Sequence, residues 1–356
     1  MYCIIMAGGS GTRFWPRSKQ KNPKQFLNIS GKRSLLKSTL DRFHAFIEWD
    51  HMYIAARDGH QEAMNAQKLK LPPSNILYEP VGKNTAPCVG LAALHVQKRD
   101  KAGTLIVSPA DHLIRNREQF KRTILLGHKI AKEKKGLVTI GIQPTRPATG
   151  YGYIQVTDPV KTDASVEAYK VKTFAEKPNI DTAKRFIESG DFLWNSGIFI
   201  FRADVILDMI EEYLPNMHAG LMEIKRYMDR PNYAEVLDRV YHQIKSISID
   251  YGIMEKAKNV YTVRGKFYWN DLGSWEQVYE ISNKDKQRNV VSGGAVLVDV
   301  KDSYVSSSKG VVAVVGLDNV VVVQEGGATL VCARDHVEDV KKVVNQLKHK
   351  KLNKHL

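Results

Sequence analysis

A glycine-rich string ending in an arginine follows the first apolar run, residues 2–5, of this 356-residue chain. Glycine lets the backbone bring its N–H groups close to a ligand, and successive N–H groups in a turn form an anion-binding concavity. An arginine two residues past the last glycine adds a forked donor that suits phosphate. The string favours a loop that holds a triphosphate, and its candidate residues are Ala7, Gly8, Gly9, Gly11, Thr12 and Arg13.

Two better-known phosphate loops do not fit this string. The dinucleotide fingerprint needs a third glycine where Phe14 stands, and the Walker string Gly-Lys-Ser/Thr occurs nowhere in the chain. A tight turn without a ligand remains an alternative. A turn needs no cations, however, and five of them crowd the string: Arg13, Arg17, Lys19, Lys21 and Lys24.

The composition places limits on partners and location. The net charge of +15 could indicate a nucleic acid partner, but much of the excess lies in the first 60 residues and in the tail after Lys341. Neither zinc-finger spacing nor an RNA-binding aromatic string occurs, so we expect no nucleic acid partner. The chain has no apolar run of about 20 residues and no secretory signal, and its three cysteines are widely spaced. We therefore expect a cytoplasmic protein without a membrane partner.

Strands alternating with helices must position the loop. Residues 52–56, 104–107 and 137–140 read as buried strands, while apolar residues within 35–43 and 89–96 fall on single helical faces. This alternation predicts βαβ units and a mixed, mainly parallel sheet. Ligands bind outside the carboxyl ends of such strands, where the glycine string and Asp111 both stand.

The pattern changes after about Asn283. Short Val-rich runs separated by Gly, Asp, Asn and Ser occupy residues 296–332, and their spacing predicts a small β-helix-like stack. A closing helix follows, with Val337, Val340, Val344 and Leu347 on one face. We expect a catalytic domain over residues 1–283 and a C-terminal β domain with its helix over residues 284–356. All candidate catalytic residues precede this β domain, so we expect it to serve assembly and stability.

Six further polar strings stand at predicted strand ends or turns. Each combines a group that could bind phosphate, metal or sugar with a turn or a helix start. They are Lys83-Asn84-Thr85-Ala86-Pro87, Pro109-Ala110-Asp111-His112, Thr149-Gly150-Tyr151-Gly152-Tyr153, Glu176-Lys177-Pro178, Trp194-Asn195-Ser196-Gly197 and Asp271-Leu272-Gly273-Ser274-Trp275.

Together with the glycine string, these strings resemble the mannose-1-phosphate guanylyltransferases, in the order found in that family. The resemblance covers the β segment as well, and so essentially the whole chain, in the short monofunctional form without an isomerase domain. It implies an α/β, Rossmann-like nucleotidyltransferase domain followed by a C-terminal β-helix-like domain. It also implies transfer of GMP from GTP to mannose 1-phosphate with Mg²⁺ as the cofactor, and a homo-oligomer, with a dimer favoured.

The resemblance also implies roles for single residues. The glycine N–H groups would hold the triphosphate, with Arg13 and Lys24 neutralising charge from two sides. Asp111 and Asp271 would hold the metal. Glu79 would read the base, helped by Asn84 and Thr85, because a carboxylate accepts from the N1–H and N2–H of guanine. Lys177 would bind the sugar's phosphate, and the sugar hydroxyls would contact Gly152, Glu176 and Asn195.

Other interpretations remain open for these strings. Asp271 could close an Asx turn, Glu176 and Lys177 could form a solvated pair, and Asn195 could cap a turn. The tryptophans fit packing better than base stacking, and His112 fits a structural neighbour of Asp111. At the level of function, the alternatives are a nucleotidyltransferase for another sugar 1-phosphate and a catalytically silent paralogue that binds a nucleotide sugar.

Overall fold

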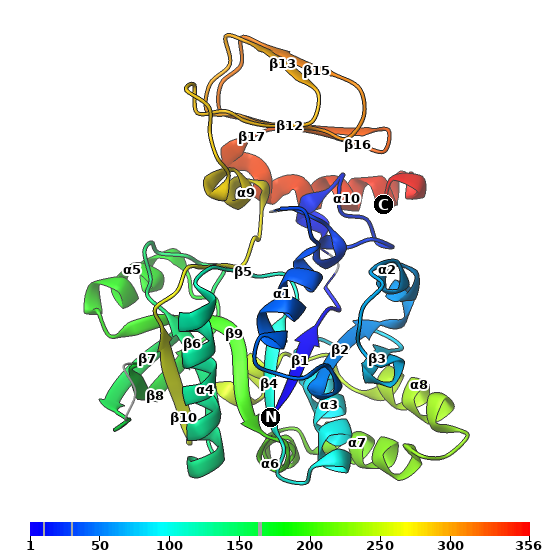
Figure 1. Ribbon diagram of the computed structural model, residues 1–356, viewed down its shortest axis with the longest axis vertical. Coiled ribbons are helices and arrows are strands. Elements are labelled where there is room, and N and C mark those ends of the chain that lie inside the picture. The colour runs from blue at the N-terminus through cyan, green and yellow to red at the C-terminus, as the bar shows by residue number, and fades with distance from the viewer. Residues whose placement is uncertain (10, 30, 163–165) are drawn as a thin grey trace.

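A nine-stranded sheet forms the body of the chain in this computed structural model, which describes residues 1–9, 11–29, 31–162 and 166–356 (Figure 1). Cys3, Ile4 and Ile5 of the first strand are fully buried, as expected for a strand covered on both faces. In spatial order the strands are β3 (Ile76–Glu79), β2 (Met52–Arg57), β1 (Tyr2–Met6), β4 (Thr104–Pro109), β9 (Phe192–Arg202), β6 (Leu137–Ile142), β10 (Val260–Gly265), β8 (Ala168–Ala175) and β7 (Tyr153–Pro159).

The sheet is mixed, as predicted. Strands β3, β2, β1 and β4 are parallel, and so are β6 and β10. Strand β9 runs antiparallel to β4 and β6, and β8 and β7 continue the antiparallel part. The carboxyl ends of the four parallel strands therefore meet at one edge, where the candidate residues follow them. A two-stranded ribbon of β5 (Leu113–Ile114) and β11 (Trp269–Asn270) lies next to this edge.

Helices cover both faces of the sheet. One apolar core includes residues of α1 (Leu35–His44), α2 (Gln61–Ala66), α4 (Arg117–Lys134) and α5 (Ile180–Ser189). The core on the other face includes residues of α3 (Thr85–Arg99), α6 (Ala203–Tyr213), α7 (Pro215–Tyr227) and α8 (Tyr233–Gln243). Helix α3 is capped by Asn84, whose side chain accepts a hydrogen bond from the Thr85 N–H at 2.9 Å.

The C-terminal β segment forms the predicted β-helix-like stack. One sheet stacks β12 (Val290–Ser292), β14 (Tyr304–Ser307) and β16 (Val320–Glu325) in parallel and adds β17 (Ala328–Ala333) antiparallel. A second sheet pairs β13 (Ala295–Val298) with β15 (Val312–Val315) in parallel. Val305, Val314 and Val322 fill the space between the two sheets. The stack is closed by α10 (Val340–His349), the red helix of Figure 1.

A third core joins the glycine-loop region to this stack within one chain. Trp275 of α9 (Trp275–Ile281) is fully buried, with ring centroids 5.1 Å from Phe14 and 5.3 Å from Tyr304. The Trp15 Nε1–H donates to the backbone carbonyl of His355 at 2.8 Å. The tryptophan interpretation as packing residues fits these contacts. The domain boundary near residues 283–289 remains our proposal. Among the described residues, every helix is too short or too polar to cross a membrane.

Candidate active site

The glycine loop leaves β1 and passes between two cavities. Gly8 and Gly9 line one cavity, and Gly11 and Thr12 line the other, while Ser10 lies outside the described residues. Gly11 has φ of 58°, and a Cβ there would lie 2.5 Å from the Cβ of Lys24, so no other residue fits. The loop is therefore placed to bind one ligand that spans both cavities.

Two contacts hold the loop from behind. The Ala7 N–H donates to the Ala55 carbonyl at 2.7 Å, so this predicted nucleotide-binding residue has its N–H engaged in the sheet. The Gln25 Nε2 donates to the carbonyls of Ala7 and Gly9 at 2.6 and 3.0 Å. The sequence interpretation missed Gln25, although the residue follows Lys24 directly. Its side chain fixes the carbonyls that would otherwise repel a phosphate.

The cavity of about 350 Å³ beside Gly11 brings together four of the predicted residues: Arg13, Lys24, Asp111 and Asp271. The Lys24 ammonium lies 2.8 Å from the Asp111 Oδ2 and donates to the Asp271 carbonyl at 2.7 Å. Lys24 is only 5% exposed. In this arrangement Lys24 neutralises a carboxylate of the site instead of standing free for a phosphate.

The two carboxylates of this cavity have different surroundings. Burial raises the pKa of Asp111, but Lys24 and His112 lower it more, and the resulting pKa is below the ordinary value. The Asp271 Oδ1 accepts from the Tyr151 hydroxyl at 2.7 Å and from the Gln277 amide at 2.9 Å. The His112 Nδ1 accepts from the Trp269 indole at 3.2 Å, which fits the structural role predicted for this histidine.

The donor set fits a magnesium ion that is shared with a substrate. No group of three or more His, Cys, Asp or Glu side chains suited to a metal occurs in the described part of the chain. Mg²⁺ is commonly held by one or two carboxylates, with phosphate oxygens and water completing its octahedron. Asp111 and Asp271 line the same cavity, and each carboxylate has a second oxygen beyond the one that makes these contacts. These two carboxylates therefore suit a metal ion that binds together with a phosphate.

The second cavity, of about 450 Å³, contains an unpaired donor and an unpaired acceptor. The Glu79 Oε1 and the Arg57 Nε are buried and have no hydrogen-bond partner among the described residues. Burial raises the pKa of Glu79 to about 7. Arg57 packs on Gly82, where a Cβ would lie 2.6 Å from the guanidinium. Because buried polar groups are normally paired, this cavity is suited to a ligand that both donates and accepts.

Asn84 and Thr85 line this second cavity but also serve the fold. The Asn84 amide oxygen caps α3, and the Thr85 hydroxyl accepts from the Ile249 N–H at 2.8 Å. Arg57 escaped the sequence interpretation because only strand pairing places it there, opposite Glu79 in the β2–β3 register.

The four predicted sugar-binding residues form one cluster. The Glu176 carboxylate lies against Gly152 Cα, the Lys177 ammonium donates to the Glu176 Oε1 at 2.5 Å, and the Asn195 N–H donates to the Gly152 carbonyl at 2.8 Å. Lys177 adopts a φ of 50°, a left-handed conformation that is uncommon outside glycine and concentrates at functional sites. The contact between Glu176 and Lys177 is consistent with the surface-pair alternative as well as with the sugar site.

Asp250 belongs to this sugar cluster, although the sequence interpretation missed it. Its Oδ1 accepts from the Asn195 amide at 3.0 Å. Burial and the nearby Glu176 raise the pKa of Asp250 to about 6. It begins the π-helical turn Asp250–Met254, which has no recognisable string in the sequence. The cluster therefore presents three carboxylate or amide side chains that could accept from hydroxyl groups.

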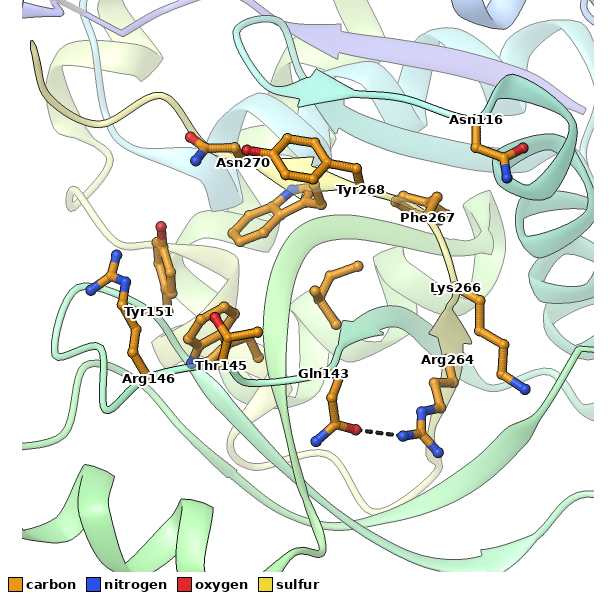
Figure 2. A pocket seen from close by; sticks show the side chains of 14 residues that line it. Asn116, Gln143, Thr145, Arg146, Tyr151, Arg264, Lys266, Phe267, Tyr268 and Asn270 are labelled. Carbon is orange, nitrogen blue, oxygen red and sulfur yellow. Dashed lines mark hydrogen bonds between the residues drawn. The ribbon is translucent and has the colours of Figure 1, made fainter. Parts of the chain in front are cut away.

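Tyr151 connects the sugar cluster to the metal pair. It precedes Gly152 in the chain, and its hydroxyl donates to Asp271. Its ring also forms part of a separate cavity of about 640 Å³, shown in Figure 2, where Arg146 stands over the Tyr151 ring and Arg264 donates to Gln143. The three predicted groups, for the nucleotide, the metal and the sugar, thus lie in one continuous arrangement.

Comparisons with known proteins identify the family of the chain. The sequence profile of the nucleotidyl transferase family matches residues 2–288, and that of the MannoseP isomerase/GMP-like β-helix domain matches residues 293–347. A mannose-1-phosphate guanylyltransferase from Salmonella muenchen is 37% identical over 357 residues, which cover 99% of this chain and 74% of that protein. The xanthan biosynthesis protein XanB from Xanthomonas campestris is 38% identical and is covered over 73% of its length.

A solved structure supports the same relationship over both domains. It is described as a mannose-1-phosphate geranyltransferase from Thermus thermophilus, with a TM-score of 0.86 and 33% identity, and the match covers 98% of this chain and 99% of that one. Its fold, its ordered strings and these relatives, which match nearly all of this chain, show that the chain belongs to the mannose-1-phosphate guanylyltransferase family of nucleotidyl transferases.

Proposed function

We propose that this enzyme transfers GMP from GTP to mannose 1-phosphate and releases pyrophosphate. The observation that carries the proposal is the hydrogen bond from Tyr151 to Asp271, because it joins the sugar cluster to the cavity of the glycine loop. The names of relatives that match nearly all of this chain give the same substrate class.

In the proposed reaction, an oxygen of the sugar's phosphate attacks the α-phosphorus of GTP in line with the departing pyrophosphate. A P–O bond to the sugar phosphate forms, and the bond between the α-phosphorus and the bridging oxygen breaks. The attacking oxygen is already ionised, so no general base is needed. The side chains must hold two anions in line, and such positioning contributes on the order of 7–11 kcal/mol.

We assign the phosphate contacts to the glycine loop, Arg13 and Lys177. Arg13 is half-exposed at the cavity and is placed to neutralise charge on the transferring and leaving phosphates. Lys24 would act through Asp111 in the arrangement described here. Mg²⁺, held by Asp111 and Asp271, would lower the negative charge that the two phosphates present to each other.

We assign base recognition to Glu79 together with Arg57. Guanine presents N1–H and N2–H donors beside its O6 acceptor, which match an unpaired carboxylate oxygen and an unpaired guanidinium N–H in one cavity. Adenine lacks the N1–H donor and the O6 acceptor. Asn84 and Thr85 lie where the base or ribose would leave this cavity.

Pyrophosphate release tests this function directly. The purified chain is assayed with Mg²⁺, each of four nucleoside triphosphates and a panel of hexose and heptose 1-phosphates. We expect the highest kcat/KM for GTP with mannose 1-phosphate. A tenfold higher kcat/KM for another pair, equal to about 1.4 kcal/mol of transition-state preference, would assign a different nucleotidyltransferase activity. Binding without turnover of any pair would favour the silent paralogue.

We expect GTP binding to weaken as the pH falls from 8 to 6. The pKa of Glu79 is raised to about 7 by burial, so the carboxylate is ionised above pH 7 and loses an acceptor when protonated below it. Calorimetric Kd values at both pH values measure the effect. Glu79→Gln should bind GTP weakly. Because this variant lacks the titrating carboxylate, its pH dependence measures the contribution of the triphosphate alone. An identical pH dependence in both proteins contradicts the assignment.

The same raised pKa affects the stability of the free protein in the opposite direction: GTP binding strengthens as the pH rises, whereas the free energy of unfolding decreases. The native state holds the Glu79 proton at pH values where the unfolded chain, with a pKa of 4.5, has lost it. Glu79 therefore costs stability as the pH rises from 4.5 through 7.

Lys177→Ala should raise the KM for mannose 1-phosphate at least tenfold and leave the KM for GTP unchanged. The lysine provides the only assigned cation of the sugar cluster, and a charge-assisted contact is worth about 1.5–3 kcal/mol. Initial rates with one substrate varied at a time measure both constants. Lys170→Ala, on an exposed position of β8, is the matched control. Equal effects on both substrates would remove Lys177 from the sugar site.

We also propose a cytoplasmic homo-oligomer, with a dimer favoured. The three cysteines are free, which suits a reducing compartment. Val296, Val298 and Val315 of the β13–β15 sheet are 53%, 48% and 64% exposed, an apolar face that a second copy could cover. Light scattering of the purified chain gives the mass that tests this proposal.

A further inference from the structure

Helix α10 of the C-terminal domain lies against the glycine loop of the catalytic domain. Figure 1 shows this helix crossing above the blue first part of the chain. Helix α10 contacts the short helix η1 (Thr12–Phe14). The Glu338 Oε2 lies 2.8 Å from the Arg13 Nε, so a residue of the short helix η7 (Arg334–Asp339), which leads into α10, contacts a proposed catalytic side chain. Both side chains, Arg13 and Glu338, are about half-exposed, so this salt bridge contributes little to the stability of the fold. Its position shows instead that the N-terminal end of α10 presents a surface to the site.

Lys341 extends from this surface into the cavity of the glycine loop. It lines the cavity together with Gly11, Arg13, Asp111 and Asp271. Lys341 is the second residue of α10 and follows Glu338, which lies in the preceding helix η7, by three residues. The next residue, Lys342, pairs with Asp339 at 2.8 Å. The two adjacent lysines therefore have different surroundings.

The cavity needs a further cation if a triphosphate enters it. The departing pyrophosphate carries most of the negative charge of the triphosphate. Arg13 already forms a salt bridge with Glu338. Lys24 is engaged by Asp111 and by the Asp271 carbonyl. Lys341 is exposed and lines the same space. Among the cations that line this cavity in the described part of the chain, it has the fewest competing contacts.

We propose that Lys341 binds the β- and γ-phosphates of the nucleotide and the departing pyrophosphate. The C-terminal domain would then supply a substrate-binding residue, beyond the assembly and stability role expected from the sequence. The inference rests on the proposed function for the identity of the nucleotide. The chemistry that it assigns is narrower: a lysine that binds the two terminal phosphates and does not contact base or sugar.

Equilibrium binding to the full chain tests the proposal. Lys341→Gln should raise the Kd for GTP and for inorganic pyrophosphate, each with Mg²⁺, by about tenfold, as expected for the loss of one charge-assisted contact. The Kd for GMP, which lacks the terminal phosphates, should stay unchanged. Lys342→Gln is the matched control and should bind all three ligands like the original chain. Lys341→Arg should recover most of the lost affinity.

Three results would overturn the proposal. They are unchanged pyrophosphate binding in Lys341→Gln, an equal loss in Lys342→Gln, or an equal loss for GMP. Absence of pyrophosphate binding by the original chain would overturn it too. Inorganic pyrophosphate carries neither base nor sugar, so these results stand even if the substrate assay selects another pair. Conversely, GTP turnover with unaffected pyrophosphate binding in Lys341→Gln would leave the proposed function in place and remove Lys341 from it.

Discussion

Asp111→Asn is expected to lower kcat for pyrophosphate release by about 10²–10³-fold, the range for removing one electrostatic contact to a transition state. The substitution removes the carboxylate proposed to hold the metal and leaves a group of the same size. Steady-state rates at saturating GTP, mannose 1-phosphate and Mg²⁺ measure the loss. Full activity in EDTA, or in this variant, would exclude the metal pair.

This variant needs a control for stability, because Asp111 also pairs with Lys24. Lys24 is 5% exposed, and a buried charge that loses its partner costs about 3–5 kcal/mol. The double variant Asp111→Asn with Lys24→Gln removes both charges. It should regain stability in urea but remain inactive. Asp271→Asn is a second test of the metal pair, and its kcat should also fall. The hydrogen bond from Tyr151 should persist, because the amide oxygen can still accept it.

Trp275→Ala is expected to lower the free energy of unfolding by about 3–5 kcal/mol, the usual cost of removing a large buried aromatic side chain. Trp275 is fully buried between Phe14 of the glycine-loop region and Tyr304 of the β-helix-like stack. Urea denaturation measures the loss, and weaker GTP binding should accompany it because Phe14 adjoins Arg13. Trp49→Ala is the control, because Trp49 is only half-buried against His44. Equal losses in both variants would contradict a shared core.

Truncation after Asn283 extends the same experiment. It removes Tyr304 and His355, which contact Trp275 and Trp15, so we expect exposed apolar surface, lower solubility and a changed oligomer. Any soluble fraction should keep some turnover with weaker GTP binding, because the residues assigned to the metal and the sugar are retained. A soluble, stably folded fragment of unchanged assembly without any activity would show that the C-terminal domain is essential to the chemistry.

The sequence was most informative where a functional residue lies next to a strand or turn that the local pattern predicts. Asp111 follows the buried strand β4 with one residue between them, so the local pattern placed it correctly at the edge of the sheet. The same pattern placed Asn195 before an apolar strand, but the residue lies inside β9. The β-helix-like stack was predictable for a similar reason. Its short strands are separated by turn residues, and the regular spacing of these turns indicates that the strands stack in successive coils.

Residues brought together by long-range packing were not predictable. Arg57 reaches the second cavity through the β2–β3 register, and Asp250 reaches Asn195 from a π-helical turn. Lys341 reaches the glycine loop because a core of side chains from three distant segments fixes α10. Lys24 shows a related limit: its sequence position indicates a cation near phosphate, but the salt bridge with Asp111 depends on where β4 ends.

The core shared by the two ends of the chain has a consequence for synthesis. Trp15 leaves the ribosome 340 residues before its hydrogen-bond partner His355. Domains fold during synthesis from the N-terminal side, but a contact of this separation must wait for both partners. The sheet can therefore assemble on a nascent chain while the neighbourhood of Arg13 remains unfinished. Full affinity for the nucleotide is therefore expected only after the segment that contains Lys341 and His355 has been synthesised.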